Sequence, residues 1–427
     1  MNSTLLLLKN CLSKRRQLVF FLFLPWLFCQ AQTNEELFRE YQFNFNLPGA
    51  RANGMGGAFI GVADDATASF SNPAGLAFLN EFAITYEYGD RILDSREGQI
   101  EGAFNSQFFQ EEIHHGRTAF FSINFRLKGW YFGVFTYDYL NESQKREFSS
   151  RSLSGGVQRA ENRAIEMNMD GVATGLGVAR RFGKWKAGFT LNYLRLKGDT
   201  HYQRNTVIID IPPTTFFYNS HIMDEDTAWG YNAGLLHEYN ERFSWGAVWR
   251  ENPKFTLQEE VLETFNQNPL FNETLDVPFV VPDVFGLGAR YKILPQFSVL
   301  LDWQKIFYSE VIDDGFLIVE SFDTETKDNY HIEDIDEFHI GLEWFLAGKR
   351  SVWALRAGYY RNPLHAVSYS GDDPAIADRF AGTGLNDEDH ATVGFGWVWR
   401  NTIEVDFSAN FWEVGREYTA SFIWRKK

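Results

Sequence analysis

Cysteine is nearly absent from this sequence of 427 residues, which contains only Cys11 and Cys29. Both residues lie before position 32, in a segment that we expect to be removed from the mature chain. The mature protein would then contain no thiol. That excludes a disulfide framework and a metal site built from thiolates.

Long apolar runs are absent as well. Beyond the N-terminal segment, no stretch approaches the roughly 18 apolar residues that a membrane-spanning helix requires. The early run from Leu18 to Phe28 is shorter, follows the basic residues 14–16, and precedes small side chains within residues 29–31. This pattern predicts a signal peptide over residues 1–31. Lipid attachment at Cys29 is the alternative interpretation.

Basic residues are scarce relative to acidic ones. The chain has 40 Lys and Arg against 56 Asp and Glu, and a formal net charge of −16. Nucleic acid requires basic patches, so this balance argues against a nucleic-acid partner.

Sequence motifs of enzymes are also missing. There is no G-x-S-x-G elbow and no H-E-x-x-H pair. The acidic stretch from His331 to His339 has cation-binding side chains, but it lacks the glycine that an EF-hand loop needs at its sharp turn. We therefore expect no catalytic site, no metal and no cofactor.

Aromatic residues, in contrast, are abundant at 17% of the chain. Membrane β-barrels use such residues on the lipid-facing surface and in two interfacial girdles. The segment from Thr402 to Phe411 alternates strictly, with Ile403, Val405 and Phe407 on one face and acidic or polar residues on the other. This period of two over about ten residues is typical of a membrane strand.

The order of the connections is more specific than any single strand. Alternation predicts about fourteen strands between Phe82 and Trp424. Short turns alternate with long connections, which include residues 141–169, 197–229 and 251–281. A barrel with both termini in the periplasm predicts this alternation, whereas a soluble sandwich gives no reason for it. The predicted fold class is therefore all-β, a transmembrane antiparallel β-barrel over residues 82–427.

Residues 32–81 fit no lipid-facing strand. They are rich in glycine and alanine, as in Gly49 to Phe59, and contain Asp64-Asp65 and a turn at Asn72-Pro73. The glycines do not have the spacing or the preceding strand of a dinucleotide-binding loop. We predict that this segment forms a hatch that folds into the barrel lumen.

The sequence GARANGMGGAFIGVADDATASFSNPAGLAFL, residues 49–79, resembles the N-terminal signature of the FadL/TodX family of outer-membrane transporters. Residues 229–255, 281–311 and 338–363 are similar to strand pairs of that family. The resemblance implies passive uptake of long-chain fatty acids or hydrocarbons through a hatch-gated barrel with a lateral exit. It also implies a monomer in the outer membrane that contacts a hydrophobic small molecule, lipid and lipopolysaccharide.

The family captures its ligand on the third and fourth outer loops, which correspond here to residues 197–229 and 251–281. Apolar side chains in these segments are the predicted ligand-binding residues: Ile208, Phe216, Phe217, Phe265, Leu270 and Phe271. A loop-packing core is the alternative role for each of them. The predicted gating residues of the hatch are Met55, Asn72, Pro73 and Gly75.

Three arginines, Arg180, Arg195 and Arg250, are candidates to meet a ligand carboxylate, because a desolvated anion needs a cation. A structural or secretion-associated barrel, which serves exported proteins, is the alternative function. A sealed lumen and a flat outer surface would favour that alternative.

Overall fold

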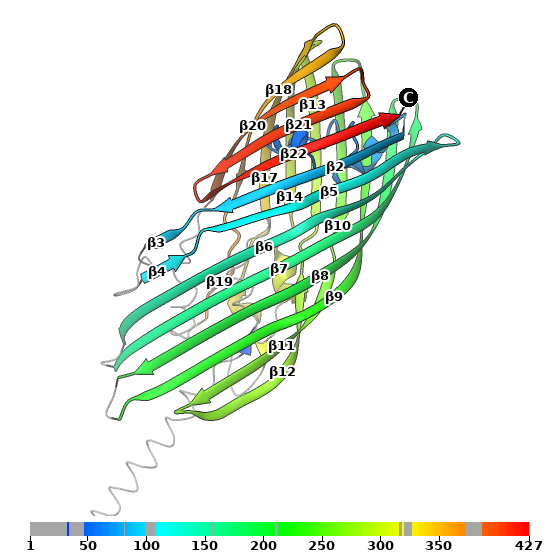
Figure 1. The fold of residues 1–427 in the computed structure, drawn as a ribbon. Helices are drawn as coiled ribbons and strands as arrows, with labels where there is room; N and C mark the ends of the chain where they lie inside the picture. The colour runs from blue at the N-terminus through cyan, green and yellow to red at the C-terminus, as the bar shows by residue number, and fades with distance from the viewer. Residues whose placement is uncertain are drawn as a thin grey trace, which may run out of the picture.

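The computed structural model describes residues 32–33, 47–80, 82–98, 107–154, 157–209, 212–315, 318–319, 327–371 and 387–426. The predicted signal peptide, residues 1–31, lies outside them. Fourteen antiparallel strands form a closed barrel in which each strand pairs with its neighbour and β22 pairs with β2 (Figure 1). The predicted fold class is therefore confirmed.

The barrel strands, in order around the wall, are β2 (Phe82–Leu93), β5 (Ile113–Leu127), β6 (Trp130–Ser154), β7 (Val157–Phe182), β8 (Trp185–Ile208), β9 (Thr214–Glu238), β10 (Phe243–Glu251), β13 (Val284–Leu294), β14 (Phe297–Ile306), β17 (Ile335–Ala347), β18 (Ser351–Asn362), β20 (Glu388–Trp399), β21 (Ile403–Trp412) and β22 (Gly415–Lys426). Each of the strands expected from the alternation is present.

Shorter elements lie inside the barrel or extend its rim. They are β1 (Gln32–Thr33), α3 (Ala50–Asn53), α4 (Ala68–Ser71), the 3-10 helix η1 (Pro73–Phe78), β3 (Arg96–Gly98), β4 (Gln107–Gln110), β11 (Lys254–Phe265), β12 (Asn268–Val280), α5 (Ser309–Gly315), β15 (Ile318–Val319), η2 (Lys327–Asn329), β16 (Tyr330–His331) and β19 (Ser368–Tyr369). None of the helices in the described ranges is long and apolar enough to cross a membrane.

The outward face of most barrel strands carries an apolar belt that ends at a charged residue. On β8 the outward residues Trp185, Phe189, Leu191 and Tyr193 are exposed and apolar, and Arg195 follows them. Charged residues end the belt in the same way on most other strands: Asp90, Asp138, Asp170, Glu251, Asp283, Lys305, Asp336, Arg361, Asp389 and Arg416. We call this set the charged ring. It marks the outer boundary of the lipid-facing surface, because a charged side chain is costly where it faces the lipid interior below that level.

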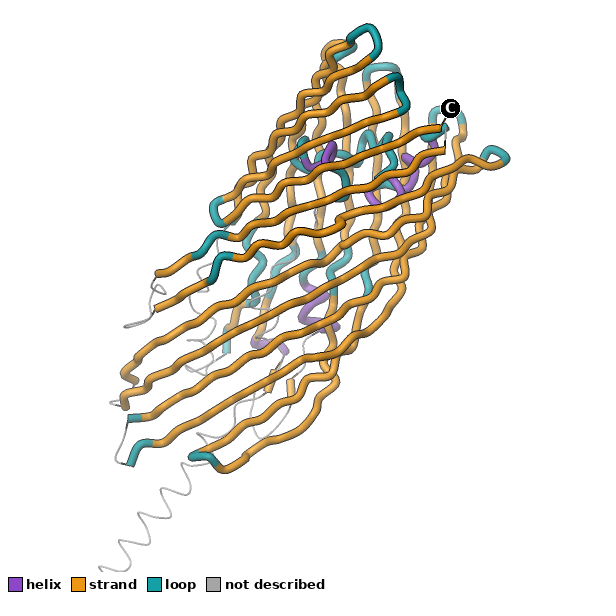
Figure 2. The backbone as a smooth tube through the Cα atoms, viewed as in Figure 1, coloured by secondary structure: helices purple, strands orange, loops and turns teal. Residues whose placement is uncertain are grey.

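One side of the wall is much taller than the other (Figure 2). β6, β7, β8 and β9 contain 25, 26, 24 and 25 residues, whereas β10 contains 9 and β14 contains 10. A membrane strand needs about 9–11 residues, so β8 continues for about 45 Å beyond Arg195. The prediction that residues 141–169 and 197–229 are loops was wrong, because these segments continue as paired strands.

The prediction of a loop was also wrong for the third long connection. Residues 251–281 form the hairpin of β11 and β12, and β11 pairs with the outer part of β9 through Val261–Ser220 and its neighbours. The hairpin thus widens the tall wall. Its alternating burial, with Phe255, Leu257 and Val261 buried, shows that one face is covered.

The inner face of the tall wall is apolar, and the connections of the short side cover it. Leu196, Tyr202, Tyr218 and Ile222 from the wall belong to one buried cluster with Val311 and other residues of the β14–β17 and β18–β20 connections. We call this set the outer apolar cluster. Its burial offsets the cost of extending the strands beyond the membrane, since the wall needs one dry face to fix its register.

The hatch fills the periplasmic half of the lumen, where inward-facing glycines allow its backbone to approach the wall. A Cβ on Gly358 would lie 2.2 Å from the Gly56 nitrogen, and one on Gly394 would lie 3.0 Å from the Gly54 Cα. Gly288 similarly faces Gly61 at 2.6 Å. These contacts leave no room for a side chain, so the glycines of the wall and the hatch match each other.

The Gly358→Ala variant is expected to displace the hatch while the barrel stays closed, because the strand ladder itself is unaffected. Limited proteolysis of the folded protein in micelles, with mass spectrometry of cuts within residues 47–80, measures this displacement. The matched control is Gly89→Ala, whose Cβ would meet only the Ala119 Cβ at 3.6 Å and the Glu417 Oε1 at 3.8 Å. Equal protection of the hatch in both variants would contradict the steric argument.

Candidate functional site

Two buried carboxylates of the wall hold the backbone of the hatch. The Glu87 carboxylate accepts hydrogen bonds from the Gly49 nitrogen at 3.1 Å and the Ala50 nitrogen at 3.0 Å. Asp302 accepts hydrogen bonds from the nitrogens of Phe59 and Ile60 at 2.6 and 2.7 Å. These bonds satisfy donors that the short, irregular hatch cannot pair internally.

Donors of the wall satisfy the hatch carbonyls in the same way. The donor–acceptor pairs are Ser244 to Gly61 at 2.8 Å, Thr190 to Ser69 at 2.7 Å, Asn232 to Phe70 at 2.9 Å and Arg250 to Ser71 at 3.1 Å. The polar inner face of the barrel is thus a template for this backbone rather than the lining of a water-filled pore.

An ion network joins the hatch to three strands. Arg51 contacts Glu343 through its Nε at 2.8 Å and its Nη2 at 3.0 Å, and contacts Asp64 at 2.5 Å. Glu343 also contacts Arg356 at 2.9 Å, and Arg356 contacts Asp406 at 2.6 Å. Burial alone would lower the pKa of Arg51, but the carboxylates of Asp64 and Glu343 outweigh it and raise the pKa above its ordinary value.

All four predicted gating residues are buried where the hatch meets the wall or itself. The Asn72 side chain donates to the carbonyls of Ile60 at 3.0 Å and Leu235 at 3.3 Å, and accepts from the Ala74 nitrogen at 3.2 Å. Pro73 follows as the first residue of η1 and lies against the wall glycines 188 and 234.

Gly75 and Met55 have steric roles. A Cβ at position 75 would lie 1.8 Å from the Ala63 carbonyl oxygen, so any other residue would move the hatch. Met55 is fully buried, and its backbone lies against the wall glycines Gly341 and Gly358. These contacts show that the four residues help to hold the hatch in its position against the wall. Their role in gating stays a prediction.

A row of aromatic rings crosses the wall just above the hatch. His339 stacks on Tyr360 with centroids 5.1 Å apart, Tyr360 on His390 at 4.2 Å, and His390 on Trp412 at 5.1 Å. The row begins at the hatch, because the His339 Nδ1 lies 2.7 Å from the Gly56 carbonyl oxygen. All four rings are at most 8% exposed, so they form a packed row on the inner face of this part of the wall.

Only one of the three candidate arginines lies inside the barrel. Arg180 lies near the periplasmic turn over the Trp130 ring, and Arg195 faces outward in the charged ring. Arg250 is 3% exposed and bonds to Gln304 at 3.0 Å and to the hatch. Its Nε has no hydrogen-bond partner, and no carboxylate pairs with it in the described part of the chain.

The predicted ligand-binding residues separate into two groups at the top of the tall wall. Phe216 and Phe265 face each other across β9 and β11 with ring centroids 5.1 Å apart, and Phe271 packs against the outer apolar cluster. Ile208 is buried on the inner face of β8. These four residues lie on the inner side of the wall.

Phe217 and Leu270 do not join them. Successive residues of a strand point to opposite faces, so Phe217 faces outward beside Asn205 of β8. Leu270 lies at the register shift of the β11–β12 hairpin and is 48% exposed. The sequence offered no signal for this split while the segments were expected to be loops.

A seam interrupts the barrel wall between β5 and β6. The ladder that joins these strands ends at Phe120–Tyr137, and the next connection is from the Glu111 nitrogen to the Lys145 oxygen at 3.2 Å. Between these points residues 113–118 pair only with β2, and residues 138 and 140–144 pair only with β7. The unpaired length is about 23 Å and starts at the level of the charged ring.

Both edges of the seam are shaped by irregular backbone. Ala119 is left out of the β2–β5 register, and Tyr139 is left out of the β6–β7 register. Such bulges bend a strand and end its pairing. An ion pair between the Arg117 Nε and the Asp138 Oδ2 at 2.9 Å crosses the seam in place of backbone hydrogen bonds.

The hatch reaches the lower edge of this seam. Phe70 of α4 lies 4.5 Å from the Tyr137 ring and 6.0 Å from the Phe135 ring, and Phe120 stacks on Phe135 at 5.7 Å. Sequence reasoning missed Phe70, Arg117 and Asp138. The only signal was the irregular pattern around residue 139, which reveals an open seam only once the pairing partners are known.

The described residues contain no group of three or more His, Cys, Asp or Glu side chains arranged to hold a metal ion. A groove of 560 Å³ lies on the lipid-facing side of β20, β21, β22 and β2 and includes Phe395, Phe407 and Tyr88. It belongs to the apolar belt and not to the lumen.

A closed barrel with an apolar belt, a charged ring and a lumenal hatch defines an outer-membrane protein. Residues 158–417 match the model of the family described as outer membrane protein transport protein (OMPP1/FadL/TodX). The chain belongs to this family, which confirms the resemblance and the predicted outer-membrane location. Comparison with curated protein sequences gave no match.

Solved structures of low sequence identity share the fold. The toluene transporter TbuX of Ralstonia pickettii is 15% identical, with 90% of this chain and 100% of that chain covered and a TM-score of 0.56. A FadL homologue of Pseudomonas aeruginosa is 11% identical, with 89% and 98% covered and a TM-score of 0.62. The P. putida toluene transporter TodX is 14% identical, with 90% and 99% covered and a TM-score of 0.58.

The Arg51→Met variant is expected to destabilise the folded protein by about 3–5 kcal/mol, because it removes the cation that buried Glu343 and half-buried Asp64 share and leaves Glu343 with Arg356. Urea unfolding in micelles, followed by tryptophan fluorescence, measures the change. The control is Arg416→Met, which breaks a half-exposed pair with Asp94 at 2.7 Å and should cost less than about 1 kcal/mol. A similar loss in both variants would refute the anchoring role of Arg51.

Proposed function

We propose that this protein lets an apolar small molecule cross the outer membrane passively and leave sideways through the seam between β5 and β6. The seam is the observation that carries the proposal, since a wall that lacks backbone pairing over about 23 Å can part without breaking a ladder. Its position at the charged ring would release the molecule at the outer edge of the lipid.

The outer apolar cluster supports an apolar ligand. It brings Tyr202, Tyr218, Phe255 and Tyr308 together with many aliphatic residues in the outer half of the lumen. The four inward residues at the top of the wall, Ile208, Phe216, Phe265 and Phe271, extend this apolar surface to the rim and remain our proposed capture site.

The hatch would act as the floor of the path. It is held by Glu87, Asp302 and the Arg51 network, so a ligand that leaves above it does not require these bonds to break. Phe70 touches the lower edge of the seam, and a small shift of α4 around Asn72 and Pro73 would change that edge.

Two substrate classes fit. The relatives named toluene transporters suggest an aromatic hydrocarbon, and the FadL homologue suggests a fatty acid. Arg250 does not decide between them, because it is buried and its Nη2 donates to the Ser71 carbonyl oxygen of the hatch, below the path proposed for the ligand. Fourteen strands fall short of the 22-stranded plugged transporters, which argues against energy-coupled uptake.

Bridging the seam tests the exit. Cysteines introduced at Gly116 and Tyr139, joined by a flexible bismaleimide, should reduce uptake of radiolabelled oleate or toluene to the level of cells that lack the protein. The matched control carries cysteines at Ile123 and Val134, which already face each other across the closed part of the same two strands. Its uptake should equal that of the wild type after cross-linking.

Unchanged uptake across a bridged seam would show that the molecule leaves elsewhere. No uptake of either compound by the wild type would instead favour the structural or secretion-associated barrel. The two failures are therefore distinguishable.

Truncation of the aromatic pair tests the capture site. The double variant Phe216→Ala and Phe265→Ala should weaken binding of a fluorescent fatty acid by roughly tenfold, because an aromatic pair in contact contributes ~1–2 kcal/mol beyond the area that it buries. Fluorescence titration in micelles measures the effect. Met223→Ala, on the outer face of β9 and 68% exposed, is the control. Equal affinity in all three proteins would remove these residues from the site.

A further inference from the structure

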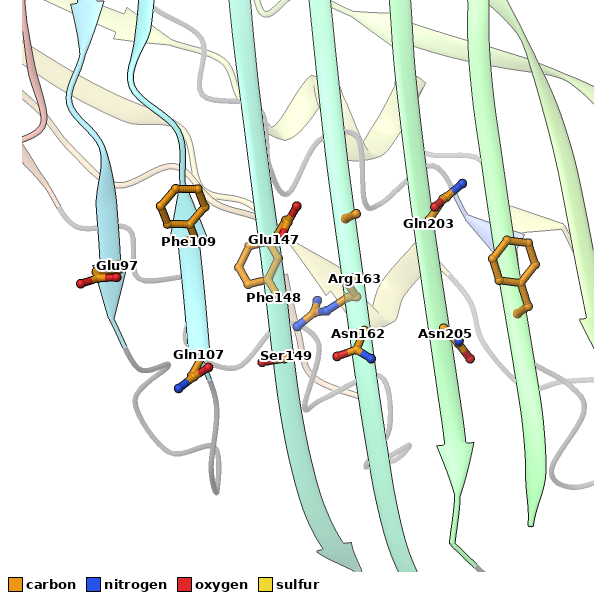
Figure 3. A pocket seen from close by; sticks show the side chains of 12 residues that line it. Glu97, Gln107, Phe109, Glu147, Phe148, Ser149, Asn162, Arg163, Gln203 and Asn205 are labelled. Carbon is orange, nitrogen blue, oxygen red and sulfur yellow. The ribbon is translucent and has the colours of Figure 1, made fainter. Parts of the chain in front are cut away.

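A groove of about 810 Å³ lies on the outer face of the tall wall, away from the lumen (Figure 3). It crosses β4, β6, β7, β8 and β9, and its outward side chains come from positions that alternate with the buried inner face. Gln203 lies eight residues beyond Arg195 of the charged ring. The groove is therefore about 27 Å further along β8 and, at the usual strand tilt, about 20 Å above the lipid boundary.

The strand register arranges the lining residues in a continuous row. The row runs Gln107, Ser149, Asn162, Asn205, Phe217, each directly opposite the next on neighbouring strands. It spans five strands, or about 19 Å. A second row begins with Phe109 and continues through Glu147, Ala164 and Gln203.

The first row has unused hydrogen-bonding capacity. Within the described residues, the side chains of Gln107, Ser149, Asn162 and Asn205 make no hydrogen bond, although neighbouring polar groups do. Gln203, for example, donates to Asn219 at 3.2 Å, and Arg163 pairs with Glu161 at 3.2 Å. Amide and hydroxyl groups both donate and accept, so this row can match a ligand that does the same.

Aromatic rings stand at opposite ends of the two rows. Phe217 closes the first row and the 43% exposed Phe109 opens the second. Planar amides beside exposed rings match the chemistry of a pyranose, whose hydroxyl groups form hydrogen bonds and whose C–H face packs on an aromatic ring.

Charge narrows the class of ligand. The groove contains the carboxylates of Glu97 and Glu147, and its arginine, Arg163, is paired with Glu161. This arrangement offers no free cation for phosphate, which would be repelled. An uncharged saccharide is the ligand that remains.

We propose that this groove binds the uncharged oligosaccharide part of the glycolipid that fills the outer leaflet around the barrel. The height of the groove above the charged ring supports this occupant, because sugar chains, and not acyl chains, surround the wall at that level. The site is separate from the lumen and stands whether or not the protein carries an apolar ligand.

Purified protein in an amine-oxide detergent, which carries no sugar headgroup, provides the test. The probe is lipid-free core oligosaccharide of lipopolysaccharide, used before and after dephosphorylation, with binding measured by calorimetry and saturation-transfer NMR. The dephosphorylated form should bind at least as tightly as the phosphorylated one. The double variant Asn162→Ala and Asn205→Ala, and separately Phe217→Ala, should weaken binding by roughly tenfold each.

Gln258→Ala, on the outer face of β11 and outside the groove, should bind as the wild type does. Heat-modifiable migration on gels checks that each variant is folded, and the wild-type measurement needs no variant at all. The proposal is overturned if the wild type binds neither probe, if dephosphorylation abolishes binding, or if the groove variants bind as tightly as Gln258→Ala.

Discussion

The hatch has an irregular backbone, and its short helices cannot satisfy all of its hydrogen-bonding groups. The remaining groups need partners from the barrel wall inside the lumen. Glu87 and Asp302 accept from its nitrogens, and Thr190, Asn232, Ser244 and Arg250 donate to its carbonyls. Because an unpaired buried backbone group costs about as much as a lost hydrogen bond, this matching fixes the position of the hatch. The inward glycines of the wall follow from the same constraint, since the partners must come within bonding distance.

The difference in height between the two sides of the wall depends on a second requirement, the burial of one face of the extended strands. Strands beyond the membrane need one dry face, and the tall side gains it by packing Tyr202, Tyr218 and Leu257 against the connections of the short side. Its other face is exposed and largely polar. At one edge of the tall side the bulges at Ala119 and Tyr139 separate β5 from β6, and the ion pair of Arg117 and Asp138 crosses the seam there. The proposed capture residues lie on the inner face of this sheet, the outer groove lies on its other face, and the seam lies at its edge.

The fold could be predicted because each barrel strand carries its own local signal. Period-two alternation, as in Ile403 to Phe411, requires only that one face meet lipid and the other not, and the alternating connection lengths set both termini on one side. The same reasoning failed for residues 141–169, 197–229 and 251–281. Alternation continues there, but polar residues face outward and replace the aromatic belt, so the pattern no longer differs from that of a solvated loop until its covering residues are known.

The turn at Asn72 could be predicted because its cap on the Ala74 nitrogen is local, whereas the close approach of Gly75 to Ala63 required the folded hatch. The roles proposed for these residues in gating, and for the others in ligand binding, stay predictions. The sequence by itself determined the strand number, the belt, the hatch and the family, since these rest on local periodicity and composition. Only the tertiary structure decided which faces Phe216 and Phe217 occupy, which of the three candidate arginines is lumenal, and where β5 and β6 lack pairing. Those properties depend on the register between strands distant in sequence, which a shift of one residue would invert.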